Sequence, residues 1–287
     1  MTKEFNFAEL LRLEGKSQRT VEEYVRRVNL WYKYLFREND IFAATRQDVM
    51  DYQAFLLKQG QNIRTVNVKL SSLSSYYEHA IQHGLLENNP VPKGVYIKLP
   101  APDTPRLTDD DLQLIEAWMD TLQANMRAAF WCLYGSGARV GEIAKLTKAD
   151  ISVIGGAIYL NIKGAKWGSD RKIPIMHAKA AKVVWKFAQE QSPSTQPLFR
   201  LSKRTIQGYA AKFGNETGLP FHCHILRHNL ATRLVEKGVP LVKIQSLLGH
   251  KTPSMTMHYT KNANFNVAEY APIDIKYKLK KGKLDNE

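Results

Sequence analysis

Histidine side chains cluster near the end of the chain, where they could transfer protons or bind a ligand. Five of the eight histidines lie between residues 222 and 258. His224 and Arg227 are three residues apart at the start of a predicted helix, so the two side chains share one helical face. An apolar stripe on another face consists of Leu226, Leu230 and Leu234. We therefore predict that the face carrying His224 and Arg227 is free for a ligand.

A metal ion is one candidate for that ligand. The run His222-Cys223-His224, followed by His228, offers zinc-binding side chains at close spacing. The run lacks the His-Glu-x-x-His arrangement, and the sequence contains no obvious second pair of ligands. We therefore expect no bound metal ion.

Four short motifs place further reactive side chains around this helix. Three of them read His224-Ile-Leu-Arg227-His228, Leu248-Gly249-His250 and Met257-His258-Tyr259-Thr260. The fourth lies upstream and reads Tyr134-Gly-Ser-Gly-Ala-Arg139-Val-Gly-Glu142-Ile. Together they resemble the signature of the tyrosine recombinase, or phage integrase, family, with the intervals of its bacterial Xer-like members. The resemblance covers essentially the whole chain.

The resemblance implies that Tyr259 attacks a DNA phosphodiester. A tyrosine has a pKa of about 10, so its phenolate is disfavoured at neutral pH by roughly 4 kcal/mol. Attack also accumulates negative charge on the non-bridging oxygens, which suits two guanidinium groups. By family position these belong to Arg139 and Arg227. His224 is expected to act as general acid/base, and His250 to hydrogen-bond the scissile phosphate.

The leaving 5′-oxygen needs a proton, which the family takes from a lysine in the turn of a β-hairpin. That turn here reads Ile162-Lys163-Gly164-Ala165-Lys166. Lys163 directly follows the strand and matches best, whereas Lys166 could reach inward in its place or contact DNA. Glu142, three residues after Arg139, is expected to support the site rather than perform chemistry.

Helical spacing of apolar residues marks the first part of the chain. Residues 1 to about 88 are predicted to form four or five helices, of which the apolar spacing marks those at about 20–35, 46–59 and 63–83. A breaker-rich segment follows them. We divide the chain into a helical core-binding domain at 1–88, a linker at 89–105, a catalytic domain at 106–272 and a basic tail at 273–287.

Residues 151–175 show β character between helical segments. Two short strands flank Gly155-Gly156 and a third covers 172–175. Further helices are expected at 108–121, 126–134, from 138 onward, and at 177–190, 203–217, 224–237 and 240–248. The predicted fold class is mostly α: a helical core-binding domain plus an α+β catalytic domain with a small antiparallel sheet. The resemblance implies that the two domains form a C-shaped DNA clamp.

Positive charge is in excess, mainly in the second part of the chain. The net charge is +14, with 14 basic against 11 acidic residues before residue 100 and 27 against 16 after it. This excess favours polyanions but does not by itself single out DNA. In the helical domain the candidate DNA contacts are Arg26, Arg27, Arg64, Asn67 and Lys69, with the 63–83 helix facing a groove.

Membrane, secreted and cofactor-dependent classes receive no support. The sequence has no run of about 18 apolar residues, and charged residues interrupt the start of the chain where a signal peptide needs an apolar core. Two cysteines are too few for a disulfide framework. We expect a cytoplasmic protein that needs no cofactor, since neither a GxxxxGK[ST] loop nor a two-metal carboxylate cluster occurs.

The resemblance implies a site-specific recombinase that cleaves and rejoins DNA through a 3′-phosphotyrosyl link and a Holliday junction. A homotetramer would act on two duplexes with inverted motifs, and the basic tail would be either an arm or a segment swapped between protomers. The helical pattern begins within the first 20 residues. This favours an Xer-like or resolvase-like role, in resolution or integration of a mobile element or replicon dimer. The alternatives are a type IB-like nicking and closing enzyme and a non-catalytic DNA-binding protein.

Overall fold

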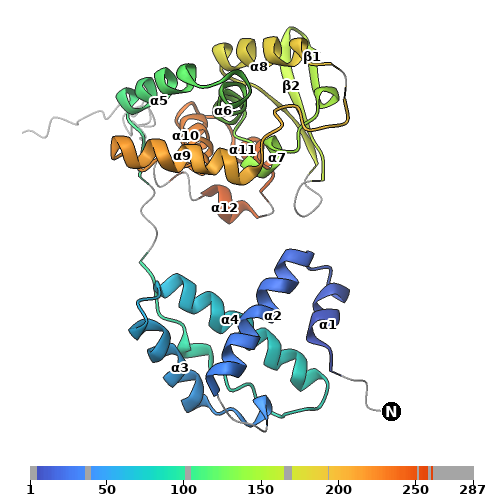
Figure 1. Ribbon diagram of the computed structural model, residues 1–287, viewed down its shortest axis with the longest axis vertical. Coiled ribbons are helices and arrows are strands. Elements are labelled where there is room, and N and C mark those ends of the chain that lie inside the picture. Colours follow the sequence, from blue (N-terminus) through green and yellow to red (C-terminus); the bar gives the residue numbers. More distant parts are fainter. Residues whose placement is uncertain are drawn as a thin grey trace, which may run out of the picture. The chain divides into compact units, whose positions relative to one another are not determined.

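The structure is a computed structural model in which the chain forms two compact units, Met1–Asp103 and Thr104–Glu287. It describes residues 5–35, 40–100, 105–164, 170–192, 194–250, 252–257 and 260. Each unit is described by itself (Figure 1). Within these described ranges, no helix is both long and apolar enough to cross a bilayer.

The first unit is built from helices in its described residues. They are α1 (Phe7–Leu13), α2 (Gln18–Leu35), the 3-10 helix η1 (Ile41–Ala43), α3 (Arg46–Lys58), α4 (Ile63–Gln82) and the 3-10 helix η2 (Lys93–Val95). The start of α3 is fixed by a capping box between Thr45 and Asp48, and the Asn62 side chain caps α4. The predicted helices of this part are therefore present, and α1 adds a short one that the apolar spacing did not mark.

Aromatic side chains fill the core of this unit. Trp31 of α2 and Tyr77 of α4 are fully buried, and the Trp31 indole donates a hydrogen bond to the Tyr77 hydroxyl at 2.7 Å. That hydroxyl donates in turn to the carbonyl of Ile41 at 2.9 Å. Because each buried polar atom has a partner, the two helices pack closely at no cost in lost hydrogen bonds.

The segment predicted as a linker, 89–105, is packed over its first half. Val95 is buried in the core of the first unit, and its carbonyl accepts a hydrogen bond from Gln53 at 2.5 Å. The Asn67 amide donates to the carbonyl of Ile97 at 2.8 Å and accepts from its N–H at 3.1 Å. Both polar atoms of Asn67, a candidate DNA contact, are thus engaged by the chain's own backbone.

The second unit combines helices with a three-stranded antiparallel sheet in the order β1-β2-β3. Its strands are β1 (Ile151–Ile154), β2 (Ala157–Ile162) and β3 (Arg171–Pro174). Its helices are α5 (Asp109–Thr121), α6 (Ala124–Ser136), α7 (Val140–Ile143), the 3-10 helix η3 (Lys148–Asp150), α8 (Ala178–Glu190), α9 (Lys203–Thr217), α10 (Cys223–Glu236), α11 (Leu241–Leu248) and α12 (Pro253–Met257). The predicted fold class, mostly α with a small antiparallel sheet, is confirmed.

Helix α6 is the centre of the second unit. Every residue from Ala128 to Ser136 is buried, and α5, α8, α9 and α10 all contact this helix. Gly135 allows the closest approach, because a Cβ there would lie 2.7 Å from the side chains of both Ala180 and Ile175. The α6 helix therefore provides a rigid base from which the chain continues into α7.

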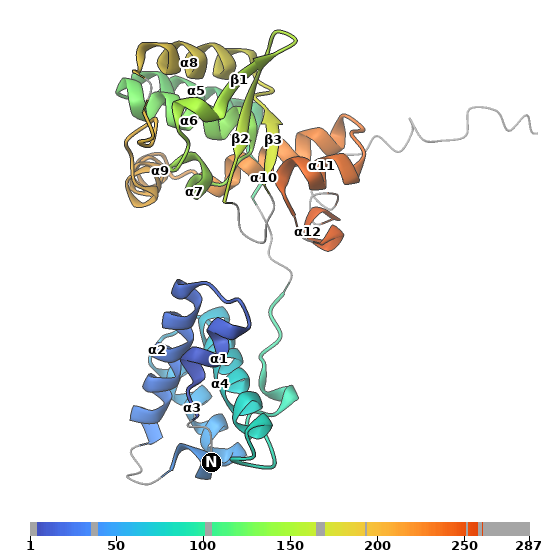
Figure 2. The ribbon, with the colours of Figure 1, turned by 90° about the vertical axis from the view of Figure 1, so that its right-hand side faces the viewer.

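Four elements that carry or adjoin predicted site residues lie near one another. Helix α7 follows α6 directly, α10 packs against both α6 and α11, and α11 also contacts β3. Figure 2 shows β3, α10 and α11 grouped on one side of the second unit. Segments more than 60 residues apart in the chain are thus brought together around the end of α11.

Candidate active site

Arg139 lies at the start of α7, where two partners fix its guanidinium. Its Nη1 donates to Oε1 of Glu142 at 2.9 Å, and its Nη2 donates to the carbonyl of Gly249 at 3.0 Å. The backbone N–H of Arg139 also donates to Oε2 of Glu142 at 2.8 Å. The side chain keeps 27% of its area exposed. Arg139 is therefore held in place and still accessible.

Arg227, the second predicted catalytic arginine, is buried within α10. Its side chain is 1% exposed, with Nη1 donating to the Gly137 carbonyl at 2.9 Å and Nη2 to the Leu248 carbonyl at 2.7 Å. The prediction that His224 and Arg227 share an open face was wrong for Arg227. The physical reason is that carbonyls at the ends of α6 and α11 lack intrahelical donors, and this guanidinium provides them.

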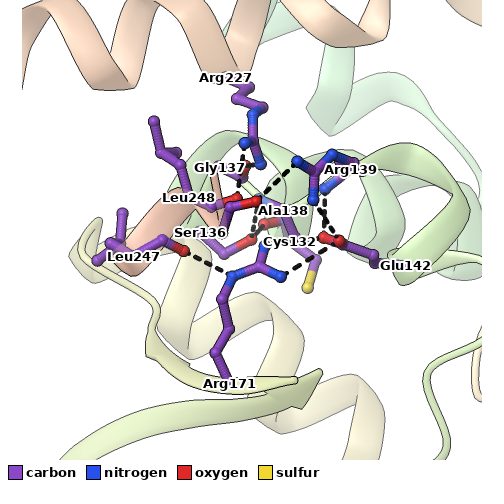
Figure 3. A network of polar contacts seen from close by, with 11 residues as sticks. Cys132, Ser136, Gly137, Ala138, Arg139, Glu142, Arg171, Arg227, Leu247 and Leu248 are labelled. Carbon is purple, nitrogen blue, oxygen red and sulfur yellow. Dashed lines mark hydrogen bonds and ion pairs between the residues drawn. The ribbon is translucent and has the colours of Figure 1, made fainter. Parts of the chain in front are cut away.

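Three consecutive carbonyls at the end of α11 accept hydrogen bonds from three arginines (Figure 3). Arg171 Nε donates to Leu247 at 2.8 Å, Arg227 to Leu248 at 2.7 Å and Arg139 to Gly249 at 3.0 Å. The three donors come from β3, from α10 and from the residue before α7. Cations are stabilised at a helix C-terminus by the unsatisfied carbonyls and the helix dipole. The end of α11 thus gathers the arginines at one place.

Arg171 is the participant that sequence reasoning missed. The other two arginines stand in recognisable motifs, whereas Arg171 reads as one of several basic residues near a predicted strand. Its position at the start of β3 was the one available signal, since a charged residue flanking a buried strand position needs a partner when it is enclosed.

Glu142 is the counter-charge of this cluster. Its side chain is 8% exposed, and it forms ion pairs with Arg139 at 2.9 Å and with Arg171 at 3.0 Å. Burial by itself would raise the pKa of Glu142, but hydrogen bonds from Arg171 and Arg139 outweigh it and lower the pKa below its usual range. The carboxylate therefore stays ionised between the two arginines.

Two predicted site histidines are held neutral. Burial, followed by the charges of Arg227 and Arg139, lowers the pKa of His250 to about 4. Its Nδ1 lies 2.9 Å from the Thr256 hydroxyl. The side chain of His224 reaches solvent, yet loss of hydration around the ring and the Arg227 charge lower its pKa in the same direction. At pH 7 both imidazoles are therefore neutral.

The buried imidazole of His250 gives the stability of the second unit a defined pH dependence. With a pKa of about 4 when folded and about 6.5 when unfolded, the unfolded chain binds the proton first as the pH falls. The contribution is complete above pH ~6.5 and is lost progressively down to pH ~4. Between pH 7.5 and 5, His250→Gln should therefore lose about 2 kcal/mol less unfolding free energy than the parent. Urea denaturation at both pH values tests this; parallel losses would contradict it.

A cavity of about 570 Å³ opens beside Arg139. Its lining includes Arg139, Glu142, Lys145, Lys163, Lys203 and His224. Four of the predicted site residues thus line one cavity, while Arg227 and His250 are not among its lining residues. Tyr259, the predicted nucleophile, lies outside the described residues, as do Lys166 and the basic tail.

Lys163 follows β2 and is paired with a carboxylate. Its Nζ lies 2.7 Å from Oδ1 of Asp150, while 62% of the lysine side chain remains exposed. Burial alone would raise the pKa of Asp150, but hydrogen bonds from Lys163 and Thr147 lower it. The ionised Asp150 thus holds the lysine at the edge of the cavity.

The histidine run considered for zinc has other contacts. The His222 ring accepts a hydrogen bond from the N–H of Ile225 and so caps α10. The rings of His224 and His228 meet edge to face, with centroids 4.7 Å apart. No group of three or more His, Cys, Asp or Glu side chains suited to a metal ion occurs among the residues that the structure describes.

Basic residues predicted as DNA contacts gather where α2 faces α4. Burial, and then the charges of Arg26 and Arg27, lower the pKa of Lys69. Both arginines pair with Glu23, and Arg27 also donates to the Ser72 hydroxyl at 3.1 Å. Glu23 thus pairs with two of these cations, and Lys69 interacts with the charges of the same two arginines. Arg64 is exposed near the start of α4.

Comparison with known families covers both units. The model of the phage integrase family matches residues 105–265, and that of the phage integrase N-terminal SAM-like domain matches residues 6–84. The first match alone spans more than half of the chain. The chain belongs to the phage integrase family of tyrosine recombinases. The predicted family and enzyme class of this recombinase are thereby confirmed.

Individual relatives point to the Xer-like type. The recombinase is 32% identical over 270 residues to tyrosine recombinase XerA of Pyrococcus horikoshii, which covers 89% of this chain and 87% of the relative. Its fold matches that of the Tn1549 transposon integrase in complex with a circular intermediate DNA, at a TM-score of 0.74 and 18% identity, over 92% of this chain and 96% of that one. It also matches the fold of the lambda integrase in a tetramer bound to a Holliday junction. The TM-score is 0.66 and the sequence identity 22%, and the match covers 86% of this chain and 76% of that one.

Proposed function

We propose that this recombinase acts at specific DNA sites and uses Tyr259 as its nucleophile. The observation that carries the proposal is the convergence of Arg139 and Arg227 on neighbouring carbonyls at the end of α11. Two permanent cations held at the end of one helix form a preorganised site for a phosphodiester, whose oxygens gain negative charge during attack. Site-specific DNA recombination is the activity that the family supports.

Arg139 is the arginine placed to touch the phosphate first. A guanidinium has five N–H donors, and the bonds to Glu142 and Gly249 leave others to face the cavity. Arg227 lies behind the cavity lining, where it fixes the carbonyls and adds its charge. Removing one preorganised donor of this kind typically costs about 3 to 4 kcal/mol in the barrier.

Proton transfers then complete the reaction. The Tyr259 oxygen bonds to phosphorus as its proton passes to neutral His224, and the bond from phosphorus to the 5′-oxygen breaks. Lys163, paired with Asp150, gives its proton to that 5′-oxygen. His250 hydrogen-bonds the phosphate. The product is a 3′-phosphotyrosyl link, which a 5′-hydroxyl from a second duplex can reverse without a cofactor.

The assembly we propose has four protomers on two duplexes with inverted motifs, passing through a Holliday junction. The lambda integrase tetramer bound to such a junction, which shares this fold, supports the proposal. In the first unit, the phosphate contacts would be Arg26, Arg27, Arg64 and Lys69, where cations outnumber their carboxylate partner.

Covalent capture tests the nucleophile. A duplex selected by binding from a random library, nicked beside each candidate cleavage position, should trap wild type as a 3′-labelled adduct that survives SDS. Tyr259→Phe should give no adduct because the phenol oxygen is the nucleophile, whereas the matched Tyr270→Phe should keep wild-type yield. An adduct retained in Tyr259→Phe, or lost in Tyr270→Phe alone, would overturn the assignment.

The same assay separates the rival functions. A non-catalytic binding protein would shift the selected duplex without forming an adduct. A type IB-like enzyme would form the adduct and relax a supercoiled plasmid with one site, yet leave two-site plasmids unrecombined. We expect two-site plasmids to give deletion products when the sites are direct repeats and inversion products when they are inverted repeats.

A further inference from the structure

Arg171 is a buried arginine that the proposed chemistry does not use. Its side chain is 9% exposed, which is unusual for a charged residue outside a reactive site. Its Nε donates to the Leu247 carbonyl at 2.8 Å, while Nη1 and Nη2 donate to Oε1 and Oε2 of Glu142 at 3.2 and 3.0 Å. Figure 3 shows its guanidinium between the end of α11 and the Glu142 carboxylate. Three donors of one planar group therefore hold two separate elements.

The first of these elements carries Arg139. Glu142 Oε1 accepts from both Arg139 and Arg171, while Oε2 accepts from the Arg139 backbone and from Arg171. A two-point bond fixes the plane of the carboxylate as well as its position. Without Arg171, the Glu142 carboxylate could rotate, and the Arg139 guanidinium would no longer be held in one orientation.

The second element carries His250. Leu247 is followed by Leu248 and Gly249, and Gly249 has a φ of +64° that turns the chain toward His250. A Cβ at Gly249 would lie 2.9 Å from Nη1 of Arg171. The guanidinium thus packs directly against the turn, and the absence of a side chain at 249 is what makes this contact possible.

The third element carries Lys163. Arg171 pairs with Ile162 in the antiparallel register of β2 and β3, and Lys163 is the next residue after Ile162. Fixing Arg171 therefore also fixes the end of β2 from which the lysine leaves the sheet. One side chain is connected to the positions of all three groups.

We propose that Arg171 is a positioning residue that sets Arg139, His250 and Lys163 in register around one phosphate. It ties α7, the end of α11 and the β2–β3 hairpin to a single planar group. Lysine cannot replace it, because an ammonium offers one point of attachment and cannot span the carboxylate and the carbonyl together. The inference rests on the proposed strand-cleavage function and deepens it.

The test compares Arg171→Lys with wild type on the nicked duplex in single turnover. Misplacing catalytic groups by about 1 Å can cost about 100-fold in rate. We therefore expect adduct formation to fall about 100-fold in Arg171→Lys, with the Kd for DNA within about threefold of wild type. The exposed Lys182→Gln on α8, which also changes a basic side chain of the second unit, should leave both quantities unchanged.

Chemical rescue distinguishes a positioning role from a merely structural one, because added guanidinium ion would not restore the rate if Arg171 only stabilised the fold. Adding guanidinium ion at low concentration to Arg171→Ala should restore part of the rate, whereas sodium at equal ionic strength should not. Circular dichroism identifies the temperature at which each variant is folded. Gly249→Ala, which keeps Arg171 but crowds its guanidinium, is the second variant and should show the same loss of rate with retained DNA binding.

The possible outcomes distinguish a failure of the positioning role of Arg171 from a failure of the proposed strand cleavage. If wild type forms the adduct and Arg171→Lys forms it at a rate within about threefold, the positioning role is wrong and strand cleavage stands. A rate loss explained wholly by weaker DNA binding or by the unfolded fraction also overturns it. If wild type forms no adduct on the selected duplex, the proposed function itself fails.

Discussion

Replacing Arg227 with alanine should lower the free energy of unfolding by about 2 to 4 kcal/mol and reduce adduct formation by about 100- to 1000-fold. The carbonyls of Gly137 and Leu248 are buried and each loses a donor, at about 1 to 3 kcal/mol apiece. Release of the buried charge offsets part of this cost. The rate falls because the carbonyls behind the cavity lining are no longer fixed and the charge of Arg227 is gone. Urea denaturation and single-turnover cleavage measure the two effects.

Arg233→Ala is the matched control for that substitution. Arg233 lies on the same helix, α10, but is 42% exposed and pairs only with the exposed Asp109 among the ion pairs of the described residues. Exposed pairs contribute about 1 kcal/mol or less, so this variant should remain close to wild type in stability and rate. Equal destabilisation by the two alanines would show that the buried carbonyl contacts contribute little.

Gly137→Ala should cost about 2 to 5 kcal/mol of unfolding free energy. Gly137 has a φ of +64°, a left-handed conformation that costs other residues about 1 to 2 kcal/mol. A Cβ there would also lie 2.8 Å from Leu230 and 3.3 Å from Leu248, and overpacking of this kind typically adds about 1 to 3 kcal/mol. Because Gly137 joins α6 to Arg139, cleavage should weaken as well.

Gly218→Ala isolates the conformational part of this effect. Gly218 caps α9 with a φ of +73°, and a Cβ there would have no neighbouring atom within 4 Å. Its loss should therefore be about 1 to 2 kcal/mol, with no change in cleavage. The difference between the two variants in urea denaturation measures the packing contribution. A difference near zero would mean that Leu230 and Leu248 move aside freely.

Elements with a regular apolar repeat could be predicted closely from the sequence. Val66, Leu70, Leu73 and Tyr77 recur every three or four residues, and α4 buries all of them. The Thr108 to Asp111 capping box likewise predicted the start of α5. Such signals are local, because they depend on residues within one or two helical turns. The family resemblance added Arg139, Arg227, His224 and His250, whose surroundings the structure now describes.

Contacts between distant segments could not be predicted in this way. Arg171 meets Leu247 across 76 residues, and Arg139 meets Gly249 across 110. Neither spacing leaves a local pattern, since each depends on where the end of α11 lies after folding. The same applies to Arg227. Its position on a polar helical face suggested that the side chain is exposed, but it is buried and donates to the carbonyls of Gly137 and Leu248. The packing of the first half of the linker could not be predicted either, because a few buried valines among prolines form no helical or strand repeat.

The run of three arginine-bound carbonyls at the end of α11 makes the arrangement of the site collective. No one of these arginines can shift without disturbing a helix end to which the other two are also attached. A displacement of α11 by a fraction of a helical turn would break all three contacts together, so partly assembled arrangements are disfavoured over fully formed or fully released ones. The geometry of the site therefore depends as a whole on the position of one eight-residue helix.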